Sequence, residues 1–284
     1  MKEGKINPEM KIVIDSSGDT RELDGVQLAC APLKVITSEK EFVDDANANV
    51  RELIDHLSTY TGKSHSSCPS PNDWLEAFGD AKYVFCITIT SHLSGSYNSA
   101  CVAKRDYETQ HPDRRVFVID SLSTGPEMRL IAERLADLIK SGMKYDDICS
   151  SIVDYQKNAD LFFILSSLKT LANNGRVNKI VAKIAGILGI RIVGKASDEG
   201  ELALISKCRG IKNALSEIIN NIKAFSKNIK KIRITHVFNE AVANQLKDML
   251  IYEFGNIDIE IYPTGILCGY YAENNGILVG VERY

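Results

Sequence analysis

Hydroxyl side chains cluster where a predicted strand leads into a predicted helix. The segment 87–104 reads ITITSHLSGSYNSACVAK. Its hydroxyls include those of Ser91, Ser94, Ser96 and Ser99. The first N–H groups of a helix lack partners within the helix and carry a partial positive charge, and Gly95 lets a ligand oxygen approach closely. The turn therefore suits an anion, while a serine here also fits the plainer role of a helix cap.

Two further turns are rich in serine. The segment 64–71, SHSSCPSP, precedes a predicted helix, and the segment 118–125, VIDSLSTG, follows a predicted strand. In an open α/β sheet, the loops at the carboxyl ends of the strands share one rim, and ligands bind there. Several uncharged donors on that rim predict a site for a carboxylate or phosphate that is held without a metal.

An alternative use of Ser94 is nucleophilic catalysis in an acyl or phosphoester hydrolase. The nucleophile-elbow pattern G-x-S-x-G needs a glycine two residues before the serine, and His92 stands there instead. A serine nucleophile also needs a general base. The sequence does not single one out among its five histidines, which are His56, His65, His92, His111 and His236. Catalysis by Ser94 stays open as the rival to anion binding.

The elements that position these turns alternate between strand and helix in the first half of the chain. Apolar runs at 11–15, 83–90 and 115–120 predict strands. Helices are expected at 49–60, 71–78, 94–108 and 126–142, the last of them ended by Gly142. This order predicts an α/β domain with a mainly parallel, Rossmann-like sheet.

The pattern restarts after about residue 160. Strands are expected at 161–165, 203–207, 231–238 and 257–262, and helices near 166–173, 177–189 and 210–227. We therefore expect two α/β domains, residues 1–160 and 161–284, with a return of the last strand to the first domain left open.

Composition limits the class of protein. The 284 residues carry a net charge of -3, which gives no electrostatic reason to expect a nucleic-acid partner. The seven cysteines form no C-x-x-C pair, so we expect reduced thiols and no metal site. No stretch has the length of a membrane span, and the first residues lack the apolar core of a signal peptide, which leads us to expect a cytoplasmic protein.

Seven motifs, in order and at compatible spacing, resemble those of the DegV-like fatty-acid-binding proteins. That family includes the fatty-acid-carrying subunit of bacterial fatty acid kinase, and the resemblance spans nearly the whole chain. The motifs are VIDSSGDT (13–20), APLKVI (31–36), SSCPSP (66–71), LSGSYNSA (93–100), VIDS (118–121), LKTLANNGRVNK (168–179) and KCRGIKNAL (207–215).

The resemblance implies a fatty acid with its chain inside the second domain and its carboxylate at the domain interface. By position, Ser66 stands where the family has a head-group threonine, and Ser94, followed by Gly95, where it has the head-group serine. Arg176 and Arg209 match arginines that the family uses near the head group and the kinase partner. The C-terminal segment departs from the family pattern G-x-H-x-G-P-G, because Tyr271 replaces the histidine.

Tyr271 can donate one hydrogen bond but carries no positive charge near neutral pH. A carboxylate could still be held, whereas a step that needs an imidazolium loses its group. Burying a methylene is worth about 0.8 kcal/mol, so a chain of about fourteen contributes up to about 11 kcal/mol before ordering costs. Apolar runs at 161–165, 180–193 and 265–271 could line a tunnel for it, or could belong to ordinary core.

The predicted function is therefore binding of a long-chain fatty acid and presentation of its carboxylate to a partner kinase for acyl-phosphate formation. The resemblance implies a dihydroxyacetone-kinase-like subunit as that partner, and allows transient exchange of the lipid at a membrane surface. We expect no catalytic residue, no cofactor and no metal. A divergent lipid-binding protein without a kinase partner remains a second alternative beside the hydrolase.

Overall fold

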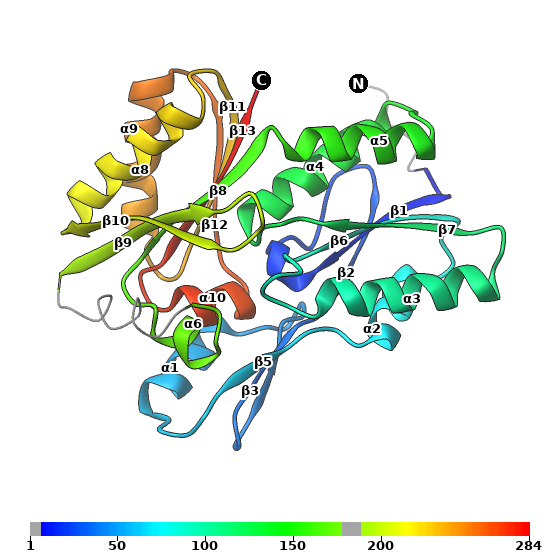
Figure 1. Cartoon of the computed structure of the whole chain (residues 1–284), viewed down its shortest axis with the longest axis horizontal. Helices are drawn as coiled ribbons and strands as arrows, with labels where there is room; N and C mark the ends of the chain where they lie inside the picture. Colours follow the sequence, from blue (N-terminus) through cyan, green and yellow to red (C-terminus); the bar gives the residue numbers. More distant parts are fainter. Residues whose placement is uncertain (1–6, 178–188) are drawn as a thin grey trace.

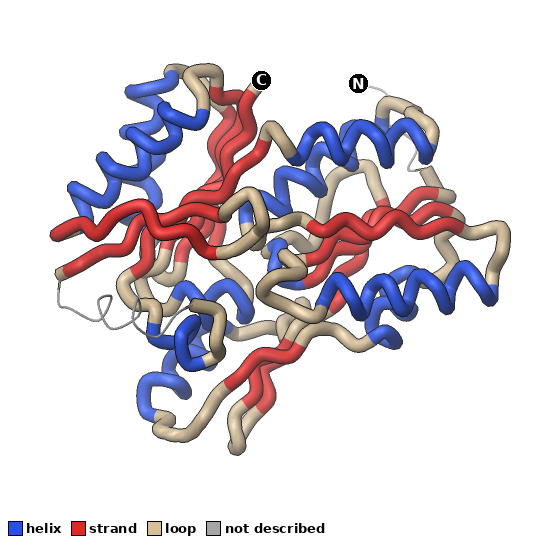
Figure 2. Tube along the Cα trace, in the orientation of Figure 1, coloured by secondary structure: helices blue, strands red, loops and turns tan. Residues whose placement is uncertain are grey.

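The computed structural model describes residues 7–177 and 189–284, and its first sheet has the expected parallel form (Figures 1 and 2). The strand order is β2-β1-β6-β7, and every neighbouring pair is parallel. Its strands are β1 (Met10–Asp15), β2 (Gln27–Ala31), β6 (Tyr83–Thr88) and β7 (Arg115–Asp120). The short helix η1 (Ser16–Gly18) follows β1.

Helices cover both faces of this sheet, as is usual for a parallel sheet. Figure 1 shows one pair on each side of the strands. One pair is α2 (Pro71–Phe78) and α3 (Ser96–Gln110), and the other is α4 (Pro126–Lys140) and α5 (Tyr145–Gln156). Because β1 and β6 are apolar on both faces, their side chains belong to two separate hydrophobic clusters. Ile12 lies in one cluster and Val13 in the other.

The second sheet has six strands in the order β10-β9-β8-β13-β11-β12. They are β8 (Ala159–Leu165), β9 (Ile190–Ala196), β10 (Leu202–Arg209), β11 (Ile229–His236), β12 (Asp258–Pro263) and β13 (Ile277–Arg283). The last strand lies between β8 and β11, so it stays in this sheet and does not return to the first. Helices α8 (Ile211–Phe225) and α9 (Glu240–Phe254) stand on one face (Figure 1).

A third, small sheet was not predicted from the sequence. It has the order β4-β3-β5, with β3 (Lys34–Ile36), β4 (Glu41–Val43) and β5 (His65–Ser67). Three helices lie near it, α1 (Val50–Thr59), α6 (Lys169–Asn173) and α10 (Ile266–Ala272). Helix α10 comes from the C-terminal part of the chain, yet it packs on α1 and β3.

The change from the first sheet to the second occurs where the chain leaves α5 and enters β8. The boundary expected between residues 160 and 161 falls inside β8. We therefore propose that the two domains divide near residue 158. The helix expected near 177–189 and most of the apolar run 180–193 fall on residues 178–188, outside the described part of the chain.

Helix α4 joins the two large sheets, because it packs on β1 and β6 and also on β8, β11 and β13. Glu133 of α4 accepts two hydrogen bonds from Arg233 of β11, each 2.8 Å long. The Arg233 side chain is only 6% exposed. Burial alone would raise the pKa of Glu133, but the hydrogen bonds and charges of Arg233 and Arg129 lower it overall.

Two buried carboxyl groups from the N-terminal part of the chain hold the first turn of α10. Asp19 Oδ1 accepts a hydrogen bond from the N–H of Gly265 at 2.7 Å. Asp44 accepts one each from Ile266 and Leu267, both at 3.1 Å. The N-cap residue of α10 offers no side-chain cap of its own, so these distant carboxyls satisfy its free N–H groups.

The two acids differ in their partners. Asp44 also accepts from Arg21 at 2.8 Å, whereas Asp19 Oδ2 is shielded from solvent and has no hydrogen-bond partner among the described residues. Burial, and then the neighbouring charge of Asp44, raise the pKa of Asp19 to about 8. Near neutral pH, the Asp19 carboxyl therefore holds a proton that it would lose in the unfolded chain.

Replacing Arg233 with methionine should lower the free energy of unfolding by about 3–5 kcal/mol, because it leaves the buried Glu133 carboxylate without its main partner. Urea denaturation would measure the loss. Arg115→Met is the control, since Arg115 makes a bidentate pair with Asp146 on the surface and its loss should change stability little. Equal losses in the two variants would contradict the prediction.

Asp19→Asn should remove a pH dependence from stability. The folded pKa of Asp19 lies above its unfolded value of 3.8, so its contribution is complete below about pH 3.8 and falls as pH rises to about 8. Asparagine keeps the acceptor for Gly265 and has no proton to lose. Denaturation at several pH values should therefore show the wild type losing stability relative to the variant, by up to about 1.4 kcal/mol per pH unit. Identical pH profiles would contradict the prediction.

Candidate functional site

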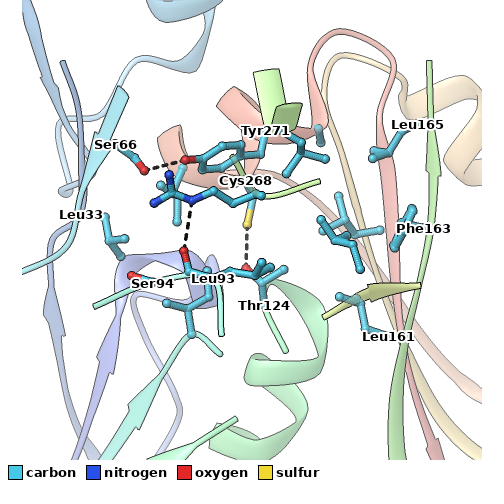
Figure 3. Close-up of a pocket in the computed structure, with 17 residues that line it drawn as sticks. Leu33, Ser66, Leu93, Ser94, Thr124, Leu161, Phe163, Leu165, Cys268 and Tyr271 are labelled. Carbon is cyan, nitrogen blue, oxygen red and sulfur yellow. Dashed lines mark hydrogen bonds between the residues drawn. The ribbon is translucent and has the colours of Figure 1, made fainter. Parts of the chain in front are cut away.

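A cavity lies between the first domain and the second sheet. It comprises about 690 Å³ of space not occupied by atoms, a volume that includes its opening to solvent. Its wall is mainly apolar, and its polar side chains gather on one side (Figure 3). An elongated ligand with one polar end would match this distribution.

The apolar side is formed by alternate residues of β8. Leu161, Phe163 and Leu165 line the cavity, and the intervening Phe162 and Ile164 belong to the core beneath α8 and α9. Successive side chains of a strand point to opposite faces, so one apolar run supplies both a core and a cavity wall. The segment 161–165 therefore contributes both to the cavity wall and to the core, the two roles that the sequence left open.

The polar side brings together four of the predicted site residues, Ser66, Ser94, Arg176 and Tyr271. Ser66 Oγ and Tyr271 Oη are 2.7 Å apart, so one of these hydroxyls donates to the other and the pair keeps one proton for a ligand. Ser94 Oγ accepts from the N–H of Ser96 at 3.2 Å, which leaves its own proton free to donate.

Arg176 is the cation that lines this cavity in the described part of the chain. Its Nε donates to the carbonyl oxygen of Leu93 at 3.2 Å, and another guanidinium nitrogen donates to that of Asn174. Burial raises the pKa of Tyr271, although the Ser66 hydrogen bond and the Arg176 charge oppose the rise. Tyr271 is therefore a neutral donor beside a fixed positive charge.

A buried carboxyl fixes the turn that carries Ser94. Asp15, at the end of β1, accepts hydrogen bonds from the Ser96 hydroxyl at 2.6 Å and from the N–H of Ile89 at 2.8 Å. Burial raises the pKa of Asp15 to about 6, against the effect of hydrogen bonds from Ser17, Ser96 and Ile89. The sequence analysis did not single out Asp15, since Ile89 and Ser96, its partners in this turn, lie more than seventy residues further along the chain.

Two predicted residues do not line the cavity. Gly95 is the exposed N-cap residue of α3, and a Cβ there would lie 3.3 Å from the sulfur of Cys68. Arg209 is exposed at the end of β10. The wall also contains Thr124 and Cys268, which were not predicted individually, with Thr124 Oγ1 3.6 Å from Cys268 Sγ. The sequence features that could have indicated these two residues are the serine-rich turn 118–125, which contains Thr124, and the apolar run 265–271, which contains Cys268.

Groups that would serve hydrolysis or metal binding do not gather in the described wall of this cavity. None of the five histidines, all within the described residues, lines the cavity, and the described part of its wall has no carboxylate. Across residues 7–177 and 189–284, no cluster of histidine, cysteine and acidic side chains could hold a metal ion. Nor is any helix in these ranges both long and apolar enough to cross a membrane.

Comparisons with known proteins place the chain within one family. The model of the DegV family, described as uncharacterised proteins, matches residues 9–282. A DegV domain-containing protein of Streptococcus pneumoniae is 38% identical over 276 residues, which cover 96% of this chain and 98% of that protein. One from Streptococcus gordonii is 39% identical over the same shares of the two chains.

Solved structures agree over nearly the whole chain. A DegV family protein from Eubacterium eligens loaded with heptadecanoic acid has a TM-score of 0.95 and 42% identity, and the match covers 97% of this chain and all of that one. The Streptococcus pneumoniae Fatty Acid Kinase (Fak) B3 protein loaded with linoleic acid has a TM-score of 0.94 and 38% identity, covering 97% and 99%. With sequence and fold in agreement, the chain belongs to the DegV family.

Proposed function

We propose that this protein binds a long-chain fatty acid in the cavity between its domains. The observation that carries the proposal is the division of the cavity into one polar side and one apolar wall (Figure 3). The carboxylate would lie among Ser66, Ser94, Arg176 and Tyr271, and the chain would extend toward β8. Fatty acids in two DegV structures of similar fold support this choice of ligand.

The two parts of the ligand contribute differently to binding. Each methylene buried against the apolar wall is worth about 0.8 kcal/mol, so the chain supplies most of the affinity. Hydrogen bonds to a charged group are worth about 1.5–3 kcal/mol each, and they fix the orientation of the carboxylate. Arg176 offsets its negative charge, and the N-terminus of α3 adds a partial positive charge behind Ser94.

We further propose that the bound carboxylate is presented to a partner kinase. In the reaction, a carboxylate oxygen would attack the terminal phosphorus of the nucleoside triphosphate bound to the kinase, and the nucleoside diphosphate would leave. This protein would shield the acyl chain and the acyl phosphate from water. The name of the Fak B3 protein supports a kinase partner, and the exposed Arg209 offers a contact outside the cavity.

An organic extract of the purified protein should contain a long-chain fatty acid, identified by mass spectrometry.

The substitution Ser94→Ala should lower the affinity for the fatty acid by about ten- to a hundredfold in a binding assay, because one hydrogen bond to the carboxylate is lost. The methyl ester of the same acid is the control. Because the ester lacks the anionic carboxylate, the substitution should lower the affinity for it much less. The proposal would be refuted if the purified wild type contained no fatty acid and took up none when it was added.

The hydrolase alternative makes the opposite prediction for the same variant. If Ser94 were a nucleophile, the wild type would turn over a chromogenic ester and Ser94→Ala would not. Because no histidine or carboxylate lies in the described wall of the cavity, we expect no turnover by either protein. Turnover that disappears in Ser94→Ala would establish the hydrolase instead.

Arg209→Ala should reduce capture of a dihydroxyacetone-kinase-like protein from a bacterial lysate without changing fatty acid affinity, because Arg209 is exposed and does not line the cavity. Capture would be scored by mass spectrometry. Lys207→Ala is the matched control, since Lys207 is another exposed cation on β10. Failure of the loaded wild type to capture such a kinase would favour a lipid-binding protein that acts without one.

A further inference from the structure

The ring of Phe163 occupies space that is open only because residue 194 is glycine. Phe163 of β8 and Gly194 of β9 are directly paired across the two antiparallel strands. A Cβ on Gly194 would lie 2.3 Å from Cζ and 2.5 Å from Cε2 of the ring. These distances are far shorter than contact between carbon atoms allows, so the ring lies over the backbone of Gly194.

The position of this ring matters because Phe163 is part of the cavity wall. Figure 3 shows Phe163 between Leu161 and Leu165, on the side of the cavity opposite Ser66 and Ser94. A ring that could not lie over Gly194 would have to turn from its present position. The adjacent core is closely packed, with Ile192 on the same face of β9, so among the described residues the open space next to the ring is the cavity itself.

We propose that Gly194 is a specificity-determining residue, which keeps the apolar end of the cavity wide enough for a long acyl chain by receiving the ring of Phe163. This inference rests on the proposed function and assigns the ligand class to long-chain rather than medium-chain acids. The position of the ring would not affect the affinity of a ligand that ends before it reaches β8. A ligand that extends along β8 would bury fewer methylenes if the ring turned inward, and its affinity would fall.

The test compares the affinities of hexadecanoic acid and decanoic acid in purified, delipidated proteins. In Gly194→Ala, the ratio of the two affinities should fall by about tenfold, which corresponds to about two methylenes that are no longer buried. The double variant Gly194→Ala with Phe163→Leu should recover the wild-type ratio, because leucine lacks the ring. Phe162→Leu is the matched control, since Phe162 is equally buried but faces away from the cavity, and its ratio should not change.

A Cβ on Gly194 would also lie 2.6 Å from the backbone oxygen of Ala203, so the alanine variant carries a cost in stability that is unrelated to the ligand. Circular dichroism would show whether it folds. If it does not, Phe163→Trp decides the question, because the larger ring should narrow the same wall and lower the same ratio. An unchanged ratio in a folded Gly194→Ala protein, or in Phe163→Trp, would overturn the inference. Failure of the wild type to bind either acid would instead refute the proposed function.

Discussion

The arrangement of the site depends on the capping of α10 by carboxyl groups that are remote in sequence. Helix α10 carries Cys268 and Tyr271, yet its own N-cap residue, Gly265, has no side chain with which to cap it. Asp19 and Asp44 supply the missing acceptors from more than two hundred residues away. An unsatisfied helix end in a buried setting is costly, so this helix has a stable position only against the first domain. The same contact fixes Tyr271, which lines the cavity.

The cavity is consequently lined by all three sheets or the turns next to them. The first domain supplies Ser94 on a turn fixed by Asp15, and the small sheet supplies Ser66. The second sheet supplies the apolar wall through β8. Helix α4 packs against both large sheets, and its Glu133 pairs with Arg233 in a region nearly closed to solvent. The shape of the cavity therefore depends on the spacing between the sheets, since a change in that spacing would separate the polar end of the cavity from its apolar wall.

Sequence reasoning succeeded where a local pattern carries the physical signal. Buried parallel strands are continuous apolar runs followed by turns, so three strands of the first sheet and the turn at Ser94 were predictable, whereas β2 was not predicted. The three-residue strands of the small sheet have no periodicity to detect. The position of Ser66 came from a motif resemblance, and its pairing with Val35 came only from the structure. The role of Gly194 was also out of reach, because it exists only through the register of β8 with β9.

Tyr271 gives the polar end of the cavity a neutral hydrogen-bonding group at the position where the motif resemblance implies a histidine. The phenol oxygen lies 2.7 Å from Ser66, so a hydrogen-bonding group is retained at this position. Its pKa is raised by burial, so the group stays neutral over the physiological range and Arg176 is left as the fixed positive charge in the described wall. A carboxylate needs donors and one compensating charge, which this set provides. The proposed binding of a carboxylate therefore does not depend on an imidazole, whereas any proton transfer by an imidazole at this position has no counterpart in Tyr271.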